Sequence, residues 1–176
     1  MSVIPSEATV SNQLATALKD TLVANLGDYI TLPANFGANN VYLMSALWLQ
    51  AALSPAICID EQGETLRTQF CKGSVGTGEA TFPGFQLVDY RFDIEVWVEA
   101  REAEFARSHV NIWRDGIKAM LNDYETLGGK WAAVTARTSE PPIEGQIGSR
   151  SFWGGVVHCN IVAGSFRGEL ALATGN

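Results

Sequence analysis

The clearest pattern in the chain is a strand of alternating polar and apolar residues that leads almost directly into an amphipathic helix. From Val88 the sequence reads VDYRFDIEVWVEA, in which large apolar residues occupy every second position. Because successive side chains of a strand point to opposite faces of a sheet, this pattern predicts a strand with one buried and one solvated face. The stretch Glu102–Asn122 then has its apolar residues in one broad stripe, which predicts a helix packed on that sheet.

The N-terminal part of the chain predicts a second long helix. Leucine or valine recurs at every fourth position within Ser6–Leu26, the spacing that lines one face of a helix. Gly27 follows directly and can adopt the left-handed conformation that ends many helices. The apolar segment Val41–Leu53 favours a further helix by composition, with a buried strand as the alternative.

Four further strands are expected besides this one. Two of them, Ala56–Asp60 and Thr65–Phe70, flank a polar turn that contains glycine, which predicts a β-hairpin. The other two, Trp131–Thr138 and Ser151–Ala163, come after the second helix. The order of elements therefore places strands both before and after a helix, as in a mixed α and β domain.

Two long loops rich in glycine or proline separate these elements, Cys71–Gly84 and Ser139–Arg150. Small residues fill the chain from about residue 165 onwards, which predicts a frayed tail. We therefore expect residues 1–176 to form one α+β domain. It would have a single antiparallel or mixed sheet, with amphipathic helices packed on one face.

Composition and charge limit the classes of function. Of the 176 residues, 47% are hydrophobic and 18% are charged, which is enough apolar material for a core. A net charge of -7 opposes a nucleic-acid backbone as the main partner. The N-terminus lacks the features of a signal peptide, and Val41–Leu53 is shorter than the ~20 residues of a membrane span. We expect a soluble protein that does not contact a membrane.

The residues that usually carry catalysis are few and scattered. Neither His109 nor His158 has a neighbour at the spacing of a zinc site or of a nucleophile and its base. The three cysteines lie far apart and outside any CxxC pattern, which is typical of reduced thiols in a core: Cys58, Cys71 and Cys159. We predict no catalytic residue, no metal ligand and no cofactor, and therefore a protein that is not an enzyme.

The polar face of the long strand contains the first candidates for a functional surface. Asp93, Glu95 and Glu99 share this face, which indicates a solvated surface or the acidic lining of a channel. Trp97 lies among them. A tryptophan in this position is consistent with cross-strand packing and equally with the anchor of a protein interface.

The two long loops contain the second group of candidates. The Gly76-Thr77-Gly78-Glu79 stretch lacks the third glycine and the βα unit of a dinucleotide site, so we interpret it as part of a loop. Because long irregular loops often make functional contacts, residues from both loops are candidate contacts with partner proteins. They are Gly76, Gly78, Glu79, Glu144 and Gln146.

The order of elements over Ser6–Ala163 resembles that of the tail terminator, or tail completion, proteins of long-tailed bacteriophages. After the N-terminal helix, LQAALSPAICID leads into the first strand and its turn. A long loop precedes the strand VDYRFDIEVWVEA and the helix EFARSHVNIWRDGIKAMLND, and WGGVVHCNIVAG forms the final strand. The resemblance rests on this order, because the family has no catalytic signature to compare.

The resemblance implies an α+β protein that acts by recognition alone. Members of the family form a hexameric ring on the end of the tail tube, stop its growth and join the tail to the head connector. The expected partners are further copies of the chain, the tail tube protein, a connector or stopper protein and, as a further candidate, the tail sheath. DNA would pass through the lumen without specific binding. The expected location is the virion, and the host cytoplasm during assembly.

Two alternatives stay open at this point. One is another component of the same region, a head–tail connector such as a stopper or adaptor ring. The other is a small acidic enzyme or ligand-binding protein with a pocket under its loops.

Overall fold

The computed structural model describes residues 10–70, 73–74, 81–82, 85–99, 103–124, 126–127 and 132–166. It contains two α-helices, three short 3-10 helices and eight strands. The helices are α1 (Val10–Asn25), η2 (Leu26–Asp28), η3 (Ala38–Asn40), η4 (Ala46–Trp48) and α2 (Ala103–Asp123). The strands are β1 (Val41–Tyr42), β2 (Ala56–Phe70), β3 (Gly73–Ser74), β4 (Thr81–Phe82), β5 (Phe85–Glu99), β6 (Ala132–Arg137), β7 (Ile143–Ile147) and β8 (Arg150–Phe166).

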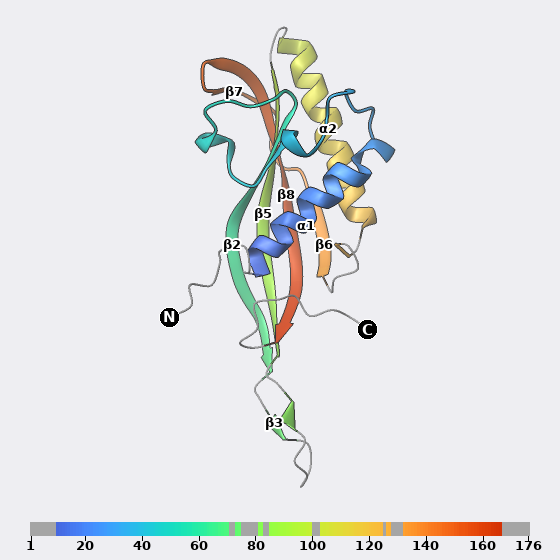
Figure 1. The fold of residues 1–176 in the computed structure, drawn as a ribbon, viewed down its shortest axis with the longest axis vertical. Helices are drawn as coiled ribbons and strands as arrows, with labels where there is room; N and C mark the ends of the chain where they lie inside the picture. Colours follow the sequence, from blue (N-terminus) through green and yellow to red (C-terminus); the bar gives the residue numbers. More distant parts are fainter. Residues whose placement is uncertain are drawn as a thin grey trace.

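One mixed sheet of six strands organises the described part of the chain, which confirms the predicted α+β class. The strand order is β1-β2-β5-β8-β6, and β7 pairs with β8 beyond the end of β6. Only β1 and β2 are parallel. The long strands β2, β5 and β8 run along the long axis of the molecule (Figure 1). A separate two-stranded pair is formed by β3 and β4.

Both α-helices cover the same face of this sheet. α1 contributes its fully buried leucines, and α2 lies over β8, β6 and β5 (Figure 1). The alternating pattern of β5 is confirmed: Tyr90, Phe92 and Ile94 enter this core, whereas Arg91 and Asp93 point to the other face. The helix and strand predicted from the strand–helix pattern therefore lie where the sequence indicated.

A second, smaller core lies on the opposite face, at one end of the sheet. It is formed by Ala46, Ala52, Ala56, Cys58, Ile147 and Phe152. The segment of residues 43–53, called the lobe below, folds over this end of the sheet together with the β7–β8 hairpin. The predicted helix over Val41–Leu53 is wrong, because the segment forms the short strand β1, one turn of 3-10 helix and otherwise irregular backbone. The buried-strand alternative holds only for Val41 and Tyr42.

The predicted hairpin between residues 56 and 70 is also wrong. β2 is one continuous strand that pairs with β5 along its length, and the supposed turn is a β-bulge at Gln62. Gly63 has φ +124, which only glycine adopts readily, so a bulge and a turn leave the same sequence signature here.

The predicted boundaries fail at two further places, and other predictions lie outside the described residues. Ser139–Arg150 is not wholly a loop, because it contains β7, whose pairing with β8 extends the sheet. β8 continues to Phe166, past the expected start of the tail. Residues 6–9 of the first helix, most of Cys71–Gly84 and the chain after residue 166 lie outside the described residues. In the part that is described, no helix is long and apolar enough to cross a membrane.

Candidate functional site

The lobe contains five of the nine large hydrophobic residues that are exposed in the described part of the chain. Leu47 is 90% exposed and Trp48 is 79% exposed, and three neighbours are about half exposed: Leu43, Met44 and Leu53. No charged residue occurs between Asp28 and Asp60. Contiguous apolar patches of this kind mark interaction sites, and the cores of protein interfaces are depleted in charge.

Hydrogen bonds fix the lobe at its base. Asn40 Nδ2 donates to the carbonyl of Pro55 (2.9 Å), and the backbone N–H of Leu53 donates to Tyr42 Oη (3.1 Å). Both bonds link the start of the segment to its end. The lobe is therefore held closed as a unit, which lowers the ordering cost of any contact that it makes.

Glu95 anchors the lobe to the sheet. Its carboxylate accepts hydrogen bonds from Ser45 Oγ (2.9 Å), from the backbone N–H of Ala46 (3.1 Å) and from Trp97 Nε1 (2.9 Å). The Glu95 carboxylate lies at the first residue of η4, where backbone N–H groups lack partners within the helix. Glu95, expected to lie on a solvated or channel face, is instead engaged by groups of the same chain.

Glu99 has a similar structural role. Arg150 pairs with it through two of its nitrogens, one of them Nε at 2.9 Å from Oε1. The same guanidinium donates through Nη1 to the carbonyl of Ala52 in the lobe (3.0 Å). The pair joins β5, β8 and the lobe at one point, so this carboxylate also serves the attachment of the lobe.

Trp97 packs against the chain itself, over one glycine of β7 and one of β8. A Cβ atom at Gly145 or Gly154 would lie 2.6 or 2.4 Å from the indole ring. The ring is half-buried against the second core. Of the two interpretations open from the sequence, cross-strand packing is the one these contacts support.

Gly154→Ala tests this packing. We expect it to lower the free energy of unfolding by about 1–3 kcal/mol, because the new methyl group forces the indole out of its position. Gly37→Ala is the matched control, since a Cβ there meets no atom within 4 Å. Urea unfolding of both variants measures the difference, and equal stability would show that Trp97 does not lie against β8.

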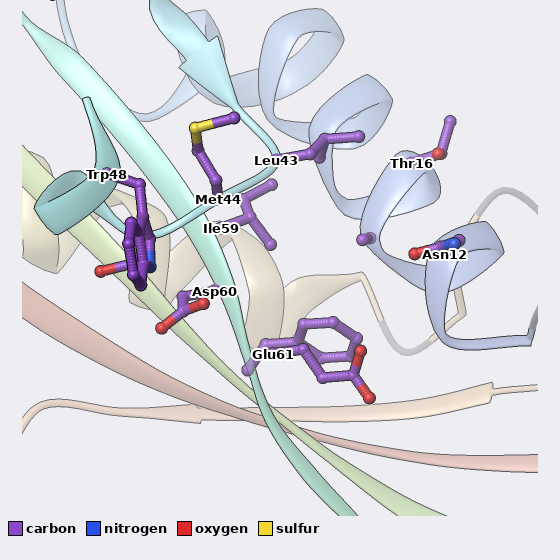
Figure 2. A pocket seen from close by; sticks show the side chains of 11 residues that line it. Asn12, Thr16, Leu43, Met44, Trp48, Ile59, Asp60 and Glu61 are labelled. Carbon is purple, nitrogen blue, oxygen red and sulfur yellow. The ribbon is translucent and has the colours of Figure 1, made fainter. Parts of the chain in front are cut away.

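A groove runs between the lobe, α1 and β2, with a volume of about 490 Å³ (Figure 2). Leu43, Met44 and Trp48 line it from the lobe, and Ile59 and Phe92 line it from the sheet. Asp60 and Glu61 add two carboxylates from β2, and α1 adds Asn12 and Thr16 (Figure 2). Burial, followed by the nearby charge of Glu95, raises the pKa of Asp60. The groove thus combines apolar walls with an acidic border.

Asp93 belongs to a different arrangement, which the sequence did not reveal. Its Oδ1 lies 2.7 Å from His158 Nδ1, and His158 Nε2 lies 2.8 Å from Ser139 Oγ. The three residues come from β5, β8 and the β6–β7 connection, and the register that places Asp93 opposite His158 is visible only in the folded sheet. Sequence spacing gave no signal for it.

This order of contacts is that of a Ser-His-Asp triad, in which histidine takes the proton of the serine hydroxyl. Acyl transfer also needs hydrogen-bond donors for the oxyanion. The residues after Ser139 are Glu140, Pro141 and Pro142, so this stretch supplies a carboxylate and two nitrogens without a hydrogen. Of the three residues that follow Ser139, only Glu140 has a backbone N–H that could serve an oxyanion.

The loop candidates divide between two regions. Gly76, Gly78 and Glu79 lie outside the described residues. Glu144 and Gln146 lie on β7 with exposed side chains, alternating with the buried Ile147. They are therefore available for contacts, although they belong to a strand rather than to a loop.

The remaining titratable residues have environments typical of structural groups. Burial raises the pKa of Cys58 and of Cys159 to about 12, so these thiols stay protonated. The ring of His109 packs against that of Phe105, with 4.0 Å between the centroids and a tilt of 40°. Within the described ranges, no three histidine, cysteine or acidic side chains are grouped to hold a metal ion. Cys71 lies outside these ranges.

Comparison with models of known protein families finds no match to this chain. Comparison with curated proteins likewise finds none.

Proposed function

We propose that the chain is a structural protein of the bacteriophage neck that caps the tail tube as a ring. In this role it terminates tail growth and joins the tail to the head connector. The proposal combines the resemblance in element order with one observation, the exposed and uncharged lobe that contains Leu47 and Trp48. A protein that acts by recognition needs such a surface, and tryptophan is enriched among the residues that dominate binding energy.

The attachment of the lobe supports this role. Three of the four candidate residues on the polar face of β5, Glu95, Trp97 and Glu99, hold the lobe and the β7–β8 hairpin in place. A surface that is ordered before binding loses less conformational entropy on association. If each lobe contacts a different surface of the next copy, the contacts are heterologous and can close into a ring.

Loss of the gene in its phage tests the proposal directly. We expect filled heads beside detached tails, some of them overlong, in negative-stain images. Tubes of normal length, or leaking heads, would favour the stopper or adaptor alternative instead. Intact virions would contradict both roles.

The serine cluster provides the test of the enzyme alternative. We expect a fluorophosphonate probe, which labels activated serines, to leave Ser139 unmodified, because the adjoining backbone offers few donors for an oxyanion. Mass spectrometry of the treated protein measures this, with Ser139→Ala as the control. Labelling of the native chain that disappears in Ser139→Ala and in Asp93→Asn would identify an acyl-transfer site.

A further inference from the structure

The outer edge of β2 is only partly paired. β1 runs parallel to β2 and pairs at only two positions, which lie opposite Ile57 and Cys58. The chain then leaves β2 and enters the lobe, and none of the other described strands pairs with this edge. Every second residue of a strand directs its backbone N–H and C=O toward such an edge, so β2 offers hydrogen-bond donors and acceptors there.

The groove between the lobe, α1 and β2 lies along this part of the edge. It touches three consecutive residues of β2, called the open edge below: Ile59, Asp60 and Glu61. Their side chains alternate, with Asp60 on the side of Trp48 and the other two on the side of α1 (Figure 2). A cavity that touches both faces of one strand must open at its edge, because the backbone separates the faces. The groove therefore occupies the place into which β1 would extend if it continued past Tyr42.

The two walls of the groove differ in character. On the side of the lobe, Met44 and Trp48 contribute large apolar side chains, both of them exposed. On the side of α1, the wall consists of small or polar residues: Asn12, Ala15 and Thr16. Successive side chains of an added strand would face these two walls in turn. An apolar side chain on the lobe side would remove part of the Trp48 ring from water.

The charge of the groove selects the partner. Asp60 and Glu61 place two carboxylates beside the open edge, and the described lining residues include no basic side chain. Burial, followed by the charge of Glu95, raises the pKa of Asp60, so a nearby cation would stabilise the ionised carboxylate. Gln62 Nε2 donates to Asp60 Oδ2 (2.8 Å), but a neutral amide does not balance the charge. The same two carboxylates would repel those of a second β2 strand, which opposes pairing between identical edges.

These features fit one kind of occupant. We propose that an extended segment of a partner protein, with alternating apolar and basic residues, adds as a strand to the open edge of β2. Its backbone pairs with residues 59–61, its basic side chains approach Asp60 and Glu61, and an apolar side chain contacts Trp48. The β-bulge at Gln62 ends the regular edge, so the added strand is only a few residues long.

Titration of the full chain with a capped peptide of sequence GVKVKVG tests this site. We expect saturable shifts of the backbone ¹H–¹⁵N signals of residues 59–61, with a dissociation constant on the order of 0.1 mM. The outward-facing amides among these residues should exchange with solvent more slowly when the peptide is bound, because the added strand bonds to that edge. Asp60→Asn combined with Glu61→Gln should weaken binding roughly fivefold, since each exposed ion pair contributes modestly.

Two controls separate the contribution of charge from that of backbone pairing. Glu64→Gln removes an exposed acidic side chain of β2 that does not line the groove, so it should leave binding unchanged. The same peptide with every valine and lysine N-methylated keeps its charge but loses the backbone donors of a strand, and it should not bind.

Three results would overturn the proposal. The first is that the GVKVKVG peptide causes no shift, or that its N-methylated form binds as well. The second is equal binding of the acidic peptide GVEVEVG, which would show that the carboxylates do not select the partner. The third is protection of the outward-facing amides before any peptide is added, since the chain itself or a second copy would then cover the edge. None of these outcomes depends on whether the chain terminates a phage tail.

Discussion

We expect Trp48→Ala to break up the proposed ring while leaving the chain folded. The side chain is 79% exposed, so its removal costs the isolated subunit little packing. In an interface, an anchoring tryptophan contributes about 2 kcal/mol or more, which corresponds to roughly 30-fold in affinity. If the lobe makes the contacts of the proposed ring, every interface contains Trp48 and the loss is repeated at each of them. Native mass spectrometry at several protein concentrations measures the distribution of oligomers.

Phe105→Ala is the control for this experiment. Phe105 is also a large exposed aromatic residue, 60% exposed, but it lies on α2 and not on the lobe. It should leave the oligomer intact if the lobe makes the contact. If Trp48→Ala oligomerised like the wild type, the lobe would not be the contact between copies of the chain. Loss of assembly in Phe105→Ala alone would move the interface to α2.

The part of the fold that could be predicted is the part in which one periodicity dominates. β5 alternates without interruption and α2 has a broad apolar stripe, and both were found where the pattern placed them. The prediction for β2 was wrong because a glycine such as Gly63 within a polar stretch is equally typical of a hairpin turn and of a β-bulge. The two structures differ in the strand with which the segment pairs. A single sequence does not show which strand that is.

The candidate surface was harder to predict for a related reason. The composition of the lobe indicates burial, since it is apolar and uncharged, yet Leu47 and Trp48 are among the most exposed side chains. An apolar composition predicts that a segment is buried from water. The apolar side chains of an assembly surface are buried only when the partner is bound. Glu95 shows the converse, because a carboxylate on a polar strand face looks solvated until the segment that it binds is folded over it.

The His158 cluster depends on the register of the sheet. Asp93, His158 and Arg137 occupy one row across three strands, although they are far apart in the sequence. A shift of one residue in β8 would turn His158 to the helix-covered face. Long-range pairing of this kind leaves no local signal in the chain.

Leu18→Ala is expected to have the largest effect on stability, about 2–5 kcal/mol. Leu18 lies in the middle of α1, is fully buried and belongs to the main core between the helices and the sheet. The substitution removes apolar contacts and leaves a cavity that the surrounding side chains fill only in part. Thermal and urea unfolding measure the loss, and an unchanged melting temperature would place α1 away from the core.

Leu47→Ala makes the same chemical change at a side chain that is 90% exposed. It should alter the stability of the subunit by no more than about 0.5 kcal/mol, as surface substitutions usually do. If the lobe makes the contacts of the ring, however, Leu47→Ala should weaken assembly, whereas Leu18→Ala should assemble normally at temperatures at which it stays folded. The two leucines thus separate burial within the subunit from burial between subunits. If Leu47→Ala lowered the stability of the chain as much as it weakened assembly, the lobe would contribute to folding and not to assembly alone.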